Sequence, residues 1–135
     1  MMDISEISTI SKGLRTLPEK ELLCGFAEVV KHALIEDRDL FTFIENNAAK
    51  ALALDQIVLE RFVHDSVVIK SSVVNRDEKE KGERRKLNFG HTFGHAFESA
   101  TGGKLSHGEA VALGLVSAAR LSVLVGYLKE DVYNE

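Results

Sequence analysis

The sequence predicts an all-α fold. Apolar residues recur three to four positions apart over long stretches, which is the spacing of one face of a helix. The 135 residues include a single proline, Pro18, and most of the ten glycines lie between positions 82 and 126, so few strong breaks interrupt the first half of the chain. A hydrophobic content of 44% and a charged content of 28% are typical of one soluble globular domain.

The first long helix is expected to begin at Leu17-Pro18-Glu19. Proline is favoured in the first turn of a helix, and the acidic residues Glu19 and Glu21 suit the positive end of its dipole. Residues 1–12 are interpreted as a polar leader or linker, and residues 13–135 as the helical domain. The apolar residues at helical spacing that follow are Leu22, Leu23, Phe26, Val29, Val30, Ala33 and Leu34.

Two more helices are predicted to begin before the middle of the chain. One covers Asp39 to Asn46, and the next is capped by Asp55 and runs toward Val74. The β-branched residues of the stretch 67–74 could form a strand, but the length of the pattern and its continuity with the preceding residues favour a helix.

The end of the sequence combines a polar segment with an apolar one. Residues 75–86 are mostly charged, which is typical of a solvated loop or helix face. From about His107 onward apolar residues lie nearly all round the helix, as expected for a central helix.

The charge and the termini indicate a cytoplasmic protein. A net charge of -4 gives no reason to expect a nucleic-acid partner, and no apolar run is long enough to span a membrane. The N-terminus lacks the basic and apolar blocks of a secretory signal. The single cysteine, Cys24, has no partner for an internal disulfide and is expected to be a buried, unreactive thiol.

Histidines form the most informative pattern. Three of the five, His91, His95 and His107, fall within seventeen residues, and the first two are four apart on one face of a helix. Glu28, on the apolar face of the first long helix, needs a cation, which Lys31 or a metal would supply. Spacing alone does not decide between a site of three histidines and a site of two histidines with Glu28.

Five separated stretches together resemble one enzyme family. They are Leu17-Pro18, Gly25 to Lys31, Asp77 to Arg84, Leu87 to Ala96 and His107 to Val111. In order and spacing they resemble the helical C-terminal part of 3-dehydroquinate synthase of the shikimate pathway. The family's N-terminal NAD-binding half is absent from this sequence, which also lacks a glycine-rich turn between a strand and a helix.

The resemblance implies a role for particular residues. The implied metal ligands, for zinc or cobalt, are Glu28, His91 and His107. Residues implied in proton transfer are Glu80 and His95. Residues implied in holding the substrate are Lys31, Lys70, Arg84 and Asn88. The stretch implied to touch NAD is Gly13, Leu14, Arg15 and Thr16; Cys24 stands where the resemblance suggests a polar residue.

The implied activity is that of an NAD- and metal-dependent phosphorus-oxygen lyase that works as a homodimer. Its substrate is a sugar acid phosphate, 3-deoxy-D-arabino-heptulosonate 7-phosphate, and its products are 3-dehydroquinate and phosphate. This chain alone is expected to be an inactive fragment. Two alternatives are another sugar phosphate cyclase, such as 2-deoxy-scyllo-inosose synthase, and a non-catalytic helical metal-binding module.

Overall fold

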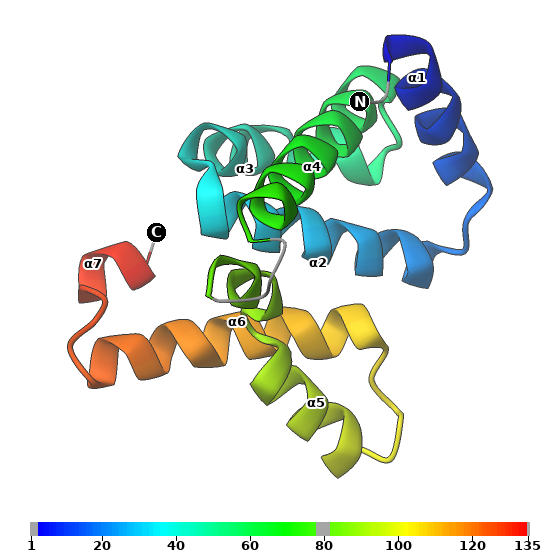
Figure 1. The fold of residues 1–135 in the computed structure, drawn as a ribbon. Helices are drawn as coiled ribbons and strands as arrows, with labels where there is room; N and C mark the ends of the chain where they lie inside the picture. Colours follow the sequence, from blue (N-terminus) through cyan, green and yellow to red (C-terminus); the bar gives the residue numbers. More distant parts are fainter. Residues whose placement is uncertain (1–2, 78–81, 135) are drawn as a thin grey trace.

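The computed structural model describes residues 3–77 and 82–134, and within them it confirms the all-α prediction (Figure 1). The helices, with two short 3₁₀ segments (η), are α1 (Ile4–Gly13), η1 (Leu14–Thr16), α2 (Glu19–Glu36), α3 (Arg38–Leu52), α4 (Gln56–Arg76), η2 (Glu83–Asn88), α5 (His91–Ala100), α6 (His107–Leu124) and α7 (Glu130–Tyr133).

Helix α2 is the central element, because it packs against α3 and α4 on one side and against α6 on another (Figure 1). One cluster of buried side chains joins α2, α3 and α4: Ala33, Leu40, Ile69 and Val73. A second cluster joins α3 and α4: Ala51, Val58 and Phe62. The Phe62 ring lies edge-on to Phe26 and Phe43, an arrangement favoured by the ring quadrupoles.

Local signals in the sequence account for the ends of these helices. Helix α2 begins directly after Pro18, as predicted, and Asp55 caps α4 by accepting from the Val58 amide. Helix α4 continues to Arg76, so the β-branched stretch is helical, as expected. Helix α3 is longer than the predicted Asp39–Asn46, because Asp37 caps it one residue earlier and no helix breaker stops it before residue 52.

The segment expected as a leader contains most of a helix. Asp3 and Glu6 form a capping box that starts α1, which packs against α4 with Ile7 buried. Ser11 is also buried and accepts a hydrogen bond from the Gln56 side chain. This segment is polar in composition, and its one short apolar face was therefore missed in the sequence. The domain boundary at residue 13 stays a prediction.

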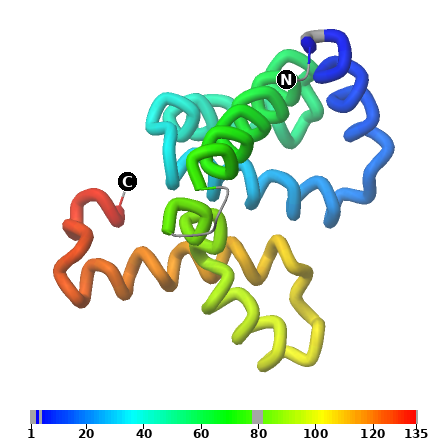
Figure 2. The backbone as a smooth tube through the Cα atoms, viewed as in Figure 1, coloured from blue at the N-terminus to red at the C-terminus, as the bar shows by residue number. Residues whose placement is uncertain are grey.

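Helices α5 and α6 pack against each other and form a second layer beneath α2 (Figure 2). The first half of α6 is central, as predicted, with Ala110, Val111 and Leu115 buried. Its second half extends past both neighbours, and Leu121 and Leu124 are exposed there, contrary to the expectation for the whole helix. None of the described helices has the length and apolar character needed to cross a membrane.

Candidate metal centre

Two glycines of α6 set how closely the three helices of the site approach one another. A Cβ added at Gly108 would lie 2.2 Å from the Cα of Cys24, so the start of α6 touches the backbone of α2 there. A Cβ added at Gly114 would lie 2.0 Å from the carbonyl oxygen of Gly90, which precedes α5. The helices of the site therefore approach one another backbone to backbone.

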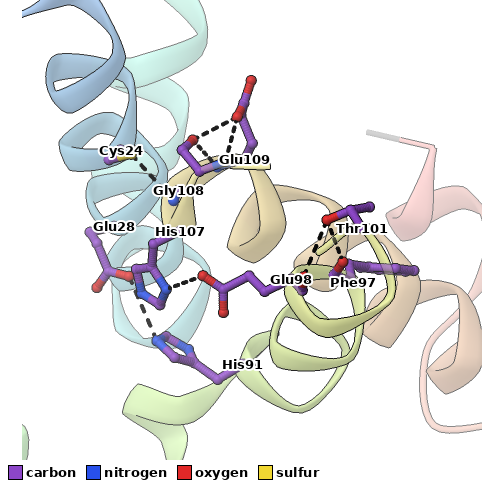
Figure 3. A network of polar contacts seen from close by, with 10 residues as sticks. Cys24, Glu28, His91, Phe97, Glu98, Thr101, His107, Gly108 and Glu109 are labelled. Carbon is purple, nitrogen blue, oxygen red and sulfur yellow. Dashed lines mark hydrogen bonds and ion pairs between the residues drawn. The ribbon is translucent and has the colours of Figure 1, made fainter. Parts of the chain in front are cut away.

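These contacts bring together three possible ligands from three helices. Glu28 lies on α2, His91 is the first residue of α5, and His107 is the first residue of α6. Each offers one ligand atom, and these atoms lie within 4.8 Å of one another. His91 Nε2 is 3.9 Å from Glu28 Oε1, and the rings of His91 and His107 are 5.4 Å apart between centroids (Figure 3).

The Glu28 carboxylate has two oxygens in different situations. Oε2 accepts from the ammonium group of Lys31, whose side chain is almost fully buried. Oε1 is buried and has no hydrogen-bond partner among the described residues, although it faces His91. Because a buried carboxylate oxygen without a donor is costly, this atom is suited to a cation. Two imidazoles and one carboxylate are a common ligand set for zinc, and cobalt accepts the same atoms.

Each histidine of this set has one ring nitrogen engaged elsewhere. His91 Nδ1 lies 3.3 Å from the carbonyl oxygen of Phe89, and His107 Nδ1 lies 3.1 Å from Glu98 Oε1. A nitrogen beside an oxygen acceptor carries the proton in a neutral ring, which leaves the lone pair on Nε2. Both rings are thereby prepared to donate Nε2 to a metal.

His95 belongs to a different donor set. One ligand atom from each of His95, Glu98 and His107 also lies within 4.8 Å of the other two, whereas His91, His95 and His107 do not form such a set among the described residues. The geometry therefore favours the set with Glu28 over three histidines. His95 is exposed and stays beside the centre, with its ring 6.3 Å from that of His107 between centroids.

The cationic and amide residues predicted to hold substrate lie on three elements. Lys31 is on α2 beside Glu28, Lys70 is exposed on α4, and Arg84 and Asn88 are exposed on η2. The segment η2 packs against both α2 and α4, and Leu87 anchors it to the core cluster of Ala33 and its neighbours.

Asp77, at the end of α4, is a buried acid that sequence reasoning did not single out. Asp77 Oδ2 accepts from the backbone amides of Gly82 and Arg84, at 2.8 and 3.0 Å. These two bonds fix where η2 begins relative to the end of α4. Glu80, predicted to transfer protons, lies outside the described residues.

The stretch predicted to touch NAD connects α1 to α2. Gly13 ends α1, and residues 14–16 form η1, where the Thr16 hydroxyl donates to the Gly13 carbonyl. The Arg15 guanidinium donates to the Leu54 carbonyl at 3.4 Å. Cys24 is half-buried rather than fully buried, and its sulfur accepts from the Gly108 amide.

Two further histidines lie outside the centre. His64 is exposed beside Asp65. His32 is buried, and its Nδ1 has no partner among the described residues. Burial, with the nearby charge of Lys31, lowers the pKa of His32 to about 4.

Glu98 is the other residue that sequence reasoning missed. Its position gives a signal, since it lies seven residues after His91 and therefore on the same face of α5. That signal shows only the face. The contact with His107 depends on how α5 and α6 turn back on each other through Gly102 and Gly103, both of which have a positive φ.

Comparison with known proteins identifies the family. Residues 25–135 match the family described as 3-dehydroquinate synthase C-terminal. The chain is 50% identical to the 3-dehydroquinate synthase of Desulforamulus reducens over 119 residues, which cover 87% of this chain and 33% of that protein. It is 46% identical to the enzyme of Psychrobacter arcticus over 131 residues, which cover 96% of this chain and 33% of the relative. The chain thus spans about a third of the length of the curated relatives it matches, and it belongs to the 3-dehydroquinate synthase C-terminal family.

Proposed function

We propose that this chain is the metal- and substrate-binding part of a 3-dehydroquinate synthase, which converts 3-deoxy-D-arabino-heptulosonate 7-phosphate to 3-dehydroquinate and phosphate. One observation carries the proposal beyond the relatives' names: Glu28, His91 and His107 converge from three helices, and Glu28 Oε1 is buried without a donor among the described residues. A zinc or cobalt ion bound there would act as a Lewis acid toward a substrate oxygen.

The surrounding residues supply positive charge and proton exchange. Arg84 and Asn88 lie on η2, which ends three residues before His91, and we assign them to hold the phosphate and carboxylate of a substrate at the centre. Lys31 faces Glu28, and Lys70 adds a cation on α4. His95, exposed one turn after His91, can exchange protons with a bound substrate without being a ligand.

Positioning is the main contribution of these residues. A substrate whose two anionic groups are both held keeps the same carbon atoms next to the metal through several steps of the reaction. The NAD dependence of the activity needs a cofactor site, which we assign mainly to the portion of the full-length enzyme that this chain does not cover, with residues 13–16 as a contact. Activity as a homodimer in the cytoplasm is part of the same proposal.

The metal assignment is tested by alanine substitution and measurement of bound zinc. Glu28→Ala, His91→Ala and His107→Ala should each lose zinc, whereas His95→Ala should keep it. His64→Ala, an exposed histidine on α4, is the matched control. Full zinc stoichiometry in the His107→Ala protein would contradict the assignment, and loss of zinc in His95→Ala would favour the three-histidine site.

The activity is tested by supplying the missing portion in trans. This chain is mixed with the part of the Desulforamulus reducens enzyme that it does not cover, together with substrate, NAD and zinc. Phosphate release that requires both parts and disappears in His91→Ala supports the proposal. Zinc binding without any phosphate release in the mixture would support a metal-binding module instead.

A further inference from the structure

Glu98 makes a contact that the proposed reaction does not use. It lies on α5, one turn after His95, and its Oε1 is 3.1 Å from Nδ1 of His107 at the start of α6. Glu98 is about a third exposed and His107 about half exposed, with side-chain fractions of 29% and 51%. Even as an ion pair, a contact this exposed would contribute little to stability, so stability does not explain it.

The orientation of the His107 ring explains the contact with Glu98. In Figure 3 the ring lies between Glu98 and Glu28, and Nδ1 faces Glu98. When Nδ1–H donates to the Glu98 carboxylate, the lone pair of the neutral ring is on Nε2, at the edge of the ring away from that carboxylate. A carboxylate that holds the second nitrogen of a ligand histidine fixes its tautomer and its rotation and makes it a better donor.

A side-chain acceptor for Nδ1 matters more for His107 than for His91. The backbone carbonyl of Phe89 serves Nδ1 of His91, and it is fixed by the chain itself. His107 follows the Gly102-Gly103 turn, and the side-chain contact that we find for its ring nitrogen reaches across to another helix. Glu98 thereby fixes the orientation of the His107 side chain, on α6, relative to α5, which also carries His91.

We propose that Glu98 is a positioning residue that holds His107 in the tautomer and orientation needed for metal binding, an inference that rests on the proposed metal centre. Glu98 could alternatively be a ligand itself, since His95, Glu98 and His107 form a second donor set. The hydrogen-bond partners of the Glu98 and Glu28 carboxylates favour a positioning role for Glu98. Glu98 Oε1 already has a donor in His107, whereas Glu28 Oε1 has none among the described residues.

The test uses this chain with Glu98→Ala, Glu98→Gln and Glu45→Ala. Glu45→Ala removes the same charge from an exposed position on α3 and is the control. Circular dichroism checks that each variant is folded. Competition with a chromophoric chelator measures zinc affinity and stoichiometry, and long-range ¹H–¹⁵N NMR of the metal-free protein measures the tautomer of His107, which a merely structural residue would not alter.

We expect wild type to bind one zinc ion with His107 protonated at Nδ1. Glu98→Ala should bind zinc about 10–100-fold more weakly and lose the Nδ1–H tautomer. Glu98→Gln keeps an acceptor oxygen and should restore the tautomer and most of the affinity, and Glu45→Ala should match wild type.

Three results would overturn the inference. Wild-type affinity and tautomer in Glu98→Ala would remove the role of Glu98 and leave the metal centre standing. A fall from two zinc ions in wild type to one in Glu98→Ala would make Glu98 a ligand. Absence of zinc binding in wild type would remove both the proposed centre and the role of Glu98.

Discussion

The contact between Gly114 and Gly90 offers a direct test of how the candidate metal centre is assembled. In Gly114→Ala the new Cβ would lie 2.0 Å from the Gly90 carbonyl oxygen, 2.8 Å from the Gly94 amide nitrogen and 3.0 Å from the Gly90 carbonyl carbon. An ordinary carbon–oxygen contact is about 3.3 Å, so the helices must separate by roughly 1.3 Å. All three neighbouring atoms are backbone, and no side-chain rotation relieves the clash.

The expected cost follows from two opposing terms. Overpacking of this kind costs about 1–3 kcal/mol, and the upper end applies because only backbone can move. Alanine gains about 1 kcal/mol over glycine inside a helix. We therefore expect Gly114→Ala to lower the free energy of unfolding by about 2 kcal/mol, or the melting temperature by about 5–10 °C.

The separation should also weaken metal binding. His91 is on α5 and His107 is on α6, and a shift of roughly 1.3 Å exceeds the tolerance of about 0.5 Å for a binding constellation. Zinc affinity should fall roughly tenfold or more. Urea unfolding of the protein freed of metal by a chelator measures the loss of stability, and zinc competition measures the loss of affinity.

Gly25→Ala is the matched control for this substitution. Gly25 lies inside α2, and an added Cβ would meet nothing within 4 Å among the described residues. This variant should be more stable than wild type by about 0.5–1 kcal/mol and should bind zinc normally. If Gly114→Ala were as stable as Gly25→Ala and kept full zinc affinity, the close α5–α6 contact would not be what positions the ligands.

Three further predictions concern activity, substrate binding and pH. This chain alone, given the heptulosonate phosphate, NAD and zinc, should release no phosphate above background, and saturable release would show that no other portion is needed. In the reconstituted enzyme, Arg84→Ala should weaken substrate binding and turnover while zinc content is unchanged, because arginine is not a metal ligand; unchanged kinetics would make Arg84 an ordinary solvated charge. Burial lowers the folded pKa of His32 to about 4 from its usual 6.5, so in the metal-free protein its contribution to stability should be fully present above pH 6.5, and at most roughly 3 kcal/mol should be lost as the pH falls toward 4. Urea unfolding against pH should show a shallower loss in His32→Leu, and an identical pH dependence in that variant would assign the loss to other groups.

The long helices could be predicted because their signals are local. Asp55 caps α4 through its own neighbour Val58, and the apolar spacing of α2 and α4 continues for several turns. The same reasoning failed for α1, where Ile7 gains its burial only by packing against α4. A short apolar face has little weight in a local pattern and becomes decisive only when a partner helix is present.

The candidate ligands could also be found in the sequence, but spacing did not give their grouping, which came only from the family resemblance. The spacing of the histidines left open a site of three histidines or a site of two histidines with Glu28, whereas the structure groups His91 with Glu28 and His107. Helices that cross bring together residues from their contact point, and here that point is set by Gly108 against Cys24 and by Gly114 against Gly90. Such contacts between distant segments leave no periodic trace in a single sequence.

Glu28 shows why two interpretations that compete in the sequence are compatible in the structure. The sequence required a cation for this carboxylate and left Lys31 and a metal as alternatives. A carboxylate has two oxygens, and here Oε2 binds Lys31 while Oε1 faces His91 without another donor. If a divalent ion occupies this set, Lys31 shares the only anionic ligand and the two imidazoles are neutral. Little of the ion's positive charge would then be neutralised by the protein, which favours binding of an anionic substrate and strong polarisation of its oxygen.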